Sequence, residues 1–197
     1  MGKRNYNQMK RISYYLALLL PIIFSCQDVQ NDQTVYFVGD SMIANWDVEA
    51  SFPNKICKNI GRDGAGINYL NDIHTGDGIT IILIGTNDLK PSLDEKHLLL
   101  LFESYKEAIL KITTKSIFLI SILPTNDTKK NFVIQKFNTL LGNWATTNNQ
   151  ITFVDSYQQF LNENGVISYD LTRDGIHLND YGYIILTNQV KSKGKWN

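Results

Sequence analysis

Short runs of consecutive hydrophobic residues alternate along the chain with longer segments in which hydrophobic positions recur every three or four residues. The short runs predict five buried strands, at residues 34–38, 55–60, 79–84, 116–122 and 151–154. The longer segments predict helices at residues 93–113, 130–144 and 181–190. Because strands and helices alternate, we expect an α/β fold: a three-layer α/β/α domain with a five-stranded, mainly parallel sheet.

The hydrophobic spacing also predicts which helix positions face the sheet. In the first long helix these are Leu98, Leu101, Phe102, Tyr105 and Ile109. In the second they are Phe132, Phe137, Leu140 and Leu141.

The first 25 residues have a different composition from the rest of the chain. Four basic residues, Lys3, Arg4, Lys10 and Arg11, precede an apolar stretch at residues 12–24. That stretch is short for a transmembrane helix and has the layout of a signal peptide. We therefore predict a signal peptide over residues 1–25.

Cys26 directly follows this segment, after Ser25, and the junction resembles a bacterial lipoprotein lipobox. The resemblance implies cleavage before Cys26 and lipidation of that cysteine. Residues 26–33 would then be the lipidated cysteine with a short polar tether, followed by a single domain at residues 34–197. The expected location is the bacterial cell envelope, lipid-anchored on the periplasmic or outer surface. An ordinary signal peptide or an uncleaved N-terminal anchor is the alternative.

Charge and cysteine content restrict the partners. The whole chain has a formal net charge of zero, and residues beyond the leader carry 15 basic and 19 acidic side chains, a charge of −4. This balance gives no indication of a nucleic-acid partner. If Cys26 is lipidated, Cys57 is the only other cysteine, so an intramolecular disulfide is not expected. Cys57 falls in the second predicted strand, where we expect a small core residue rather than a nucleophile.

Residues capable of chemistry follow several of the predicted strands. Gly39-Asp40-Ser41 follows the first strand, the glycine-rich segment 61–66 the second, and Gly85-Thr86-Asn87-Asp88 the third. Asp174-Gly175-Ile176-His177 lies between the fifth strand and the last helix. Because the carboxyl ends of parallel strands meet at one edge of the sheet, these segments can converge there.

Three of these residues fit the requirements of nucleophilic catalysis. A serine hydroxyl needs a base to take its proton, and His177 is the best candidate among three histidines. Asp174 precedes His177 by three residues, with Gly175 allowing a tight turn, so its carboxylate can reach the imidazole. The candidate catalytic set is therefore Ser41, His177 and Asp174.

Acyl transfer also needs hydrogen-bond donors for the developing oxyanion. The candidates are the backbone N–H of Ser41, the backbone N–H of Gly64 and the side-chain amide of Asn87, with Gly61 as a rival to Gly64. The alternative interpretation is structural: Ser41 as a helix N-cap, Asn87 as a turn residue and Asp174 as a cap of the last helix.

Taken together, these motifs resemble the SGNH/GDSL hydrolase family. The resemblance rests on residues 37–41, 59–64, 85–88 and 174–183, and it spans nearly all of the chain beyond the leader. It implies a flavodoxin-like sheet and ester or thioester hydrolysis through an acyl-enzyme, with no metal and no cofactor. By the same resemblance, Ser41 is the nucleophile, Asp174 and His177 are the acid and base, and Gly64 and Asn87 are oxyanion donors.

The sequence therefore predicts a serine esterase acting on short-chain or O-acetyl esters of glycans or other small molecules outside the cytoplasm. A lysophospholipase or acyl-thioesterase is one alternative. A non-catalytic, glycan-binding surface lipoprotein that has kept the fold is another.

Overall fold

The computed structural model describes residues 33–194 and residue 196. The predicted signal peptide, Cys26 and the tether as far as residue 32 lie outside the described residues. In the part that is described, no helix is both long and apolar enough to cross a bilayer.

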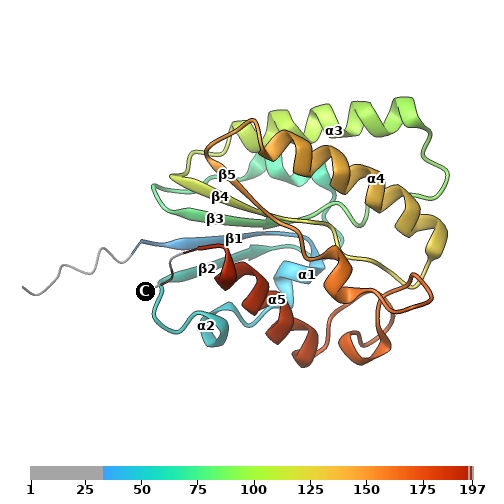
Figure 1. Cartoon of the computed structure of the whole chain (residues 1–197). Helices are drawn as coiled ribbons and strands as arrows, with labels where there is room; N and C mark the ends of the chain where they lie inside the picture. Colours follow the sequence, from blue (N-terminus) through green and yellow to red (C-terminus); the bar gives the residue numbers. More distant parts are fainter. Residues whose placement is uncertain (1–32, 195, 197) are drawn as a thin grey trace, which may run out of the picture. The chain divides into compact units, whose positions relative to one another are not determined.

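Five strands form one sheet in which every neighbouring pair is parallel. Their order is β2-β1-β3-β4-β5 (Figure 1). The strands are β1 (Val35–Gly39), β2 (Cys57–Gly61), β3 (Ile79–Leu83), β4 (Ser116–Ile120) and β5 (Ile151–Val154). The predicted α/β fold with a flavodoxin-like sheet is confirmed.

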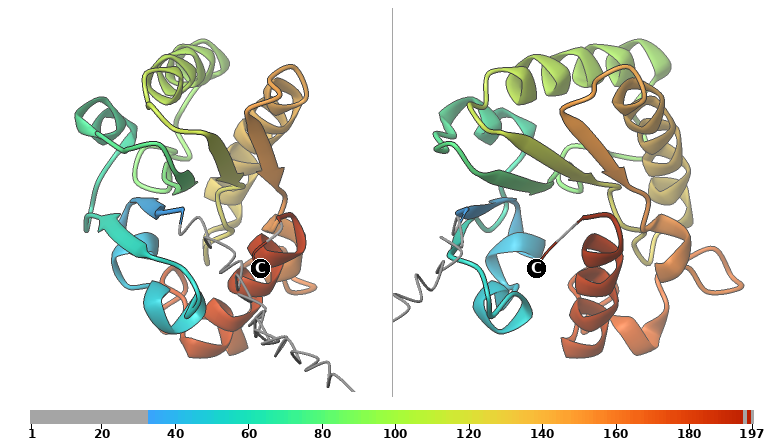
Figure 2. Two further views of the ribbon diagram at one scale, coloured as in Figure 1. Left: turned by 90° about the vertical axis from the view of Figure 1, so that its left-hand side faces the viewer. Right: turned by 60° about the vertical axis from the view of Figure 1, so that its left-hand side comes forward.

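Helices cover both faces of this sheet, as the two views of Figure 2 show. On one face lie α3 (Glu95–Leu110), α4 (Thr128–Ala145) and the short 3₁₀ helix Ile67–Asp72. On the other lie α1 (Ser41–Ala44), α2 (Val48–Ser51) and α5 (Asp180–Ser192). The domain therefore has three layers and a hydrophobic core on each side of the sheet.

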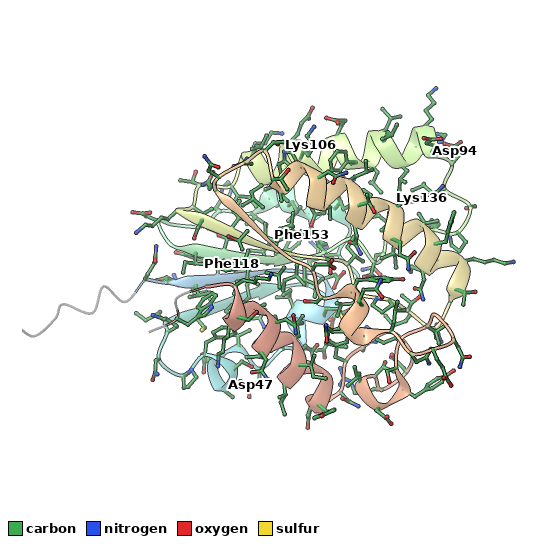
Figure 3. The ribbon with its side chains drawn as sticks, in the orientation of Figure 1. Asp47, Asp94, Lys106, Phe118, Lys136 and Phe153 are labelled. Atoms are coloured by element: carbon green, nitrogen blue, oxygen red, sulfur yellow. The ribbon has the colours of Figure 1, made fainter. Side chains whose placement is uncertain are left out.

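Successive side chains of β4 point alternately into these two cores. Ile117 and Leu119 join the core under α3 and α4, whereas Phe118 and Ile120 join the core under α5. Figure 3 shows Phe118 on the α5 side and Phe153, from β5, on the α4 side. A run of consecutive hydrophobic residues is what a strand covered on both faces requires.

Side-chain caps set where the long helices begin. Asp94 accepts the backbone N–H of His97 at 2.8 Å, and Asp127 accepts that of Lys129 at 2.9 Å. Asn179 accepts the N–H of Gly182 at 2.9 Å. Capping satisfies backbone donors that have no partner inside the helix. The observed helix starts therefore differ by one or two residues from those that hydrophobic spacing predicts.

Two predictions about individual residues are wrong. Phe132 was expected to face the sheet but is 60% exposed, with the Lys136 ammonium 4.5 Å from its ring centre. Val133 and Ile134 are buried in its place, and with Phe137 and Leu141 they form the inner face of α4. Cys57 is half-buried rather than a core residue, since β2 is the edge strand of the sheet.

The chain moves from β1 outward to β2 on one side, and then crosses back to β3 on the other side of β1. The direction of strand order therefore changes at β1, which lies at the switch point of the sheet. Ligands of open α/β sheets bind at such a switch point, beyond the carboxyl ends of the strands.

The sequence pattern does not predict the four shortest helices, because they are too short to give a periodic signal. These are α1, α2 and the 3₁₀ helices Tyr157–Phe160 and Tyr169–Leu171.

Candidate active site

Ser41 lies at the switch point, two residues after the end of β1, as the first residue of α1. Asp40 forms the N-cap of this helix, and its side chain accepts the N–H of Met42 at 2.9 Å. The Asp40 side chain is almost fully buried, so the turn that carries Ser41 is part of the protein interior.

Two further side chains fix this turn against the rest of the domain. Asn59, from β2, donates to the carbonyl oxygens of Ile43 at 2.8 Å and Trp46 at 3.1 Å. Tyr183, from α5, donates its hydroxyl to the carbonyl of Met42 at 2.8 Å. The turn is therefore held from a neighbouring strand and from the last helix, where Tyr183 lies 141 residues after Met42.

His177 lies within hydrogen-bond distance of Ser41, with 2.9 Å between His177 Nε2 and Ser41 Oγ. Its other ring nitrogen, Nδ1, is 2.6 Å from Oδ2 of Asp174. The second oxygen, Oδ1, accepts the backbone N–H groups of Ile176 at 3.0 Å and His177 at 2.7 Å. The hydrogen bonds from the His177 ring and backbone lower the pKa of Asp174 to about 2, so this carboxylate is ionised at neutral pH.

The loop that presents Asp174 and His177 is shaped by its own short-range contacts. Thr172 Oγ1 donates to the His177 carbonyl at 2.7 Å and accepts the Gly175 N–H at 2.9 Å. Gly175 has a φ of +88°, and a Cβ there would lie 2.5 Å from the Asn126 side chain. Glycine is therefore required at this position for both backbone conformation and space.

The predicted oxyanion donors lie around the same cleft as the serine hydroxyl. Ser41, Gly64 and Asn87 all line this cleft, and Gly64 adopts a φ of +69°. The Asn87 amide donates one hydrogen to the Ala65 carbonyl at 2.9 Å, which fixes its orientation and leaves its second hydrogen available.

Gly61, the rival to Gly64, does not line the cleft. Its N–H donates to Asn59 Oδ1 at 2.9 Å, so this donor already has a partner. A Cβ at Gly61 would lie 2.2 Å from the backbone nitrogen of Ala44, so the absence of a side chain there allows β2 to pack against α1. The geometry favours Gly64 over Gly61 as a donor.

The cleft has a volume of about 620 Å³ and is bordered by polar groups. Seven of its eight lining residues have polar side chains and the eighth is glycine: Ser41, Asn45, Asp63, Gly64, Asn87, Arg173, Asp174 and His177. The sequence interpretation did not include Asn45, Asp63 and Arg173. Each lies close in sequence to a predicted site residue, which is the only signal the sequence offered for them.

Two carboxylates near the site have structural contacts. Burial raises the pKa of Asp40 to about 6, with the nearby Asp88 charge acting in the same direction. Burial also raises the pKa of Asp88, whose Oδ2 accepts the Ile67 N–H at 2.9 Å. Both side chains brace loops by accepting backbone N–H groups. One oxygen of Asp40, Oδ2, is buried with no hydrogen-bond partner among the described residues.

A second Asp-x-x-His pair shows what is special about the first. Asp94 and His97, at the start of α3, are also three residues apart, with 2.7 Å between Oδ1 and Nδ1. Both side chains are exposed, and no serine contacts His97 in the described structure. The fold thus brings a serine to only one of these two pairs. No group of three or more His, Cys, Asp or Glu with metal-ligand geometry occurs among residues 33–194.

Comparison with known proteins shows the family of the chain. The family model of the GDSL-like Lipase/Acylhydrolase family matches residues 37–185. No curated protein sequence matches the chain.

Solved structures with this fold include three from bacteria. A provisionally assigned platelet activating factor from Streptococcus pneumonia is 25% identical, with a TM-score of 0.69 over 82% of this chain and 83% of that one. A GDSL-like lipase from Bacteroides thetaiotaomicron is 22% identical, with a TM-score of 0.65 over 83% and 88%. Axe2, an acetylxylan esterase from Geobacillus stearothermophilus, is 17% identical, with a TM-score of 0.60 over 83% and 95%. The family match extends from β1 into α5, and so includes both Ser41 and His177. The chain belongs to the GDSL-like lipase/acylhydrolase family and is a carboxylic ester hydrolase.

Proposed function

We propose that this protein is a serine esterase that removes short acyl groups, above all acetyl, from esters through an acyl-enzyme on Ser41. The observation that carries the proposal is the unbroken chain of contacts from Ser41 Oγ to His177 Nε2, and from His177 Nδ1 to Asp174 Oδ2. A nucleophile, a base and a group that orients the base are the minimum set for this chemistry.

In the first half-reaction, Ser41 Oγ attacks the ester carbonyl carbon while His177 Nε2 takes the hydroxyl proton. Asp174 keeps the other ring nitrogen protonated and stabilises the imidazolium that forms. Negative charge develops on the carbonyl oxygen, where the N–H groups of Ser41 and Gly64 and the free amide hydrogen of Asn87 donate to it. His177 then protonates the alcohol oxygen, which leaves with its carbon chain.

In the second half-reaction, His177 takes a proton from water, which attacks the acyl carbon bound to Ser41. Collapse of this second tetrahedral intermediate releases the carboxylic acid and returns the proton to Ser41 Oγ. The same donors stabilise both oxyanions, so one arrangement of groups serves both steps.

The cleft supports a short acyl group. None of its eight lining residues is a purely hydrocarbon side chain, so a long acyl chain would replace water with less apolar surface here than in a hydrophobic pocket. Full burial of one methylene group is worth about 0.8 kcal/mol, and this polar-lined cleft offers only part of that gain to a fatty acyl ester.

We further propose an O-acetylated glycan or a similar small ester as substrate, at the bacterial cell envelope. The signal-peptide layout of residues 1–25 supports this location, as does Cys26, which would carry the lipid anchor. The acetylxylan esterase among the structural neighbours supports the substrate class as an analogy of fold.

A panel of esters with one alcohol and acyl chains of two, four and eight carbons tests the proposal. We expect kcat/KM to be highest for acetyl and to show no rise with chain length. A hydrophobic acyl pocket would instead raise kcat/KM about fourfold for each methylene, from about 0.8 kcal/mol each. That rise would favour the lysophospholipase or thioesterase interpretation, and absence of all turnover would favour the binding module.

Lipid anchoring has its own test, in bacteria that express the full chain. We expect wild type in the membrane fraction and Cys26→Ala in the soluble extracytoplasmic fraction. Identical membrane association of both proteins would contradict lipidation of Cys26 and favour an uncleaved anchor.

A further inference from the structure

A second cavity lies next to the cleft, between the α1–α2 segment and α5. It has a volume of about 460 Å³, and we name it the α5 groove. The residues that matter here are Asn45, Asp47, Ala50, Asp180, Asn188 and Lys191. Figures 1 and 2 show α1, α2 and α5 side by side on the same face of the sheet, and Asp47 is labelled there in Figure 3. Asn45 lines both the cleft and the α5 groove, so the two cavities adjoin at this residue.

The chemistry of the reaction indicates which part of the substrate lies toward the α5 groove. The oxyanion lies toward Gly64 and Asn87, whereas the leaving oxygen must lie within reach of His177, which protonates it. Helix α5 begins three residues after His177. The alcohol part of the substrate therefore extends away from Gly64 and Asn87, toward Asn45 and α5.

Asn45 is suited to form the passage between the cavities. Its side-chain nitrogen donates to the Ser41 carbonyl at 2.7 Å, which ties the side chain to the nucleophile's helix. Its amide oxygen is then available to accept a hydrogen bond. The side chain is exposed, so a ligand can contact it without displacing the core.

The chemistry of the α5 groove matches hydroxyl groups. Asp47 and Asp180 supply acceptors, Lys191 supplies donors and Asn188 supplies both, so a ligand group that both donates and accepts is satisfied. The two carboxylates and one ammonium select neither a strongly anionic nor a strongly cationic ligand. Ile184, which is 55% exposed, adds one apolar surface. A sugar ring has the same combination of peripheral hydroxyls and apolar C–H faces, whereas a simple fatty alcohol has no further hydroxyl to pair with these groups.

We propose that the α5 groove binds the leaving alcohol of the substrate, and that this alcohol is a saccharide. The inference rests on the proposed esterase function and adds that selectivity lies in the alcohol rather than in the acyl group. The α5 groove holds the sugar while its ester carbonyl lies against Ser41.

Two neighbouring residues of α2 give a matched test. Ala50 lines the α5 groove and is exposed, whereas Glu49 is exposed on the same helix without lining it. Ala50→Trp fills the groove, and Glu49→Trp places the same bulk beside it. The substrates are ethyl acetate and a panel of mono-O-acetylated xylo-, cello- and chito-disaccharides, assayed with the full chain.

We expect wild type to have at least tenfold higher kcat/KM for one or more of the acetylated disaccharides than for ethyl acetate. Ala50→Trp should lower kcat/KM for the acetylated disaccharide about tenfold, mainly by raising KM. It should change kcat/KM for ethyl acetate less than twofold. Glu49→Trp should leave both unchanged. A milder pair, Asn188→Ala with Gln189→Ala as control, should give a several-fold loss for the disaccharide in the first variant alone.

The inference is overturned if wild type treats the disaccharides and ethyl acetate alike, or if Ala50→Trp and Asn188→Ala leave disaccharide hydrolysis intact. It is also overturned if these variants reduce both substrates equally. A wild-type protein that hydrolyses none of the esters contradicts the esterase proposal instead, so the two failures are distinguishable.

Discussion

The turn that carries Ser41 and the loop that carries Asp174 and His177 are built in different ways. The Ser41 turn is interior: Asp40 is 1% exposed, and Asn59 and Tyr183 tie the turn to β2 and α5. The side chains of His177 and Asp174 are 33% and 51% exposed, and contacts within the loop set their geometry. The proposed nucleophile, Ser41, is therefore positioned by the global fold, whereas its proposed base, His177, is positioned mainly by its own loop.

This difference predicts two kinds of mutational response. Changes around Ser41 should alter the free energy of unfolding: loss of a contact between elements should lower it, and removal of the buried Asp40 charge with its contact kept should raise it at neutral pH. Removal of the Asp174 or His177 side chain should lower activity at nearly constant stability, because both side chains are partly exposed.

His177→Ala should give the largest loss. Without the base, kcat should fall about 10⁴–10⁶-fold, in the range seen when a member of a catalytic triad is removed. Its melting temperature should stay close to that of wild type, since the side chain is partly exposed. His97→Ala is the matched control, because His97 has the same spacing and contact with an aspartate but no serine. Equal activity of His177→Ala and wild type would contradict the assignment.

Asp174→Asn should lower kcat by about 10²–10⁴-fold, because an amide can favour the wrong histidine tautomer and cannot stabilise the imidazolium by charge. Steady-state kinetics with an acetyl ester measures the effect, and Asp94→Asn on α3 is the control. A loss confined to KM, with kcat unchanged, would argue that Asp174 binds substrate rather than orienting His177.

Asp40→Asn tests the interior region through its pH dependence. Asp40 has a folded-state pKa of about 6, raised chiefly by burial, against an ordinary value near 4. The burial cost of its charge is absent below pH 4, develops as pH rises, and is complete above pH 6. The variant keeps an acceptor for the Met42 N–H, so its stability relative to wild type should increase between pH 4 and 7, by up to about 3 kcal/mol.

Urea unfolding of both proteins at several pH values measures this difference. Asp47→Asn is the control, since Asp47 caps α2 in the same way but is exposed. A stability difference that stays flat or falls with rising pH would show that Asp40 does not carry a buried charge at neutral pH.

Gly175→Ala should affect the exposed loop sterically. A Cβ at this position meets the Asn126 side chain and forces a residue with φ of +88° into strain of about 1–3 kcal/mol. We expect kcat to fall about tenfold, on the order of 1.4 kcal/mol, as His177 shifts. Gly165→Ala is the control, because Gly165 also has positive φ but open space around it. Equal loss of activity in both variants would show that the contact between residue 175 and Asn126 does not position His177.

Tyr183→Phe should have the smallest effect and should affect stability more than activity. Removing the hydroxyl leaves the buried Met42 carbonyl without this donor, at a cost of about 1–3 kcal/mol. Urea unfolding should show that loss while kcat falls only a few-fold. A large fall in kcat with unchanged stability would contradict the view that Tyr183 acts by stabilising the turn that carries Ser41.

Hydrophobic patterning predicted the five strands and the three long helices because buried strands and amphipathic helices have strong periodic signals. It missed α1 and α2, which are four residues each. It also placed Phe132 inward, because two phenylalanines five residues apart can both match a short helical pattern while lying on different faces.

The candidate catalytic residues were predictable because their types and spacing reflect chemistry within short segments. The choice between Gly61 and Gly64 as oxyanion donor could not be predicted from the sequence, because it depends on a backbone angle and on packing against α1. The roles of Asn45 and Arg173 in the cleft wall also depend on which segments the fold brings together.

The most direct test of the central claim is covalent labelling of the full chain with a fluorophosphonate, followed by intact mass measurement. An activated serine should take one phosphonyl group per chain in wild type, and Ser104→Ala, an exposed serine change on α3, should label equally. Ser41→Ala should take none. An adduct on Ser41→Ala at the wild-type level, or no adduct on wild type, would contradict the account.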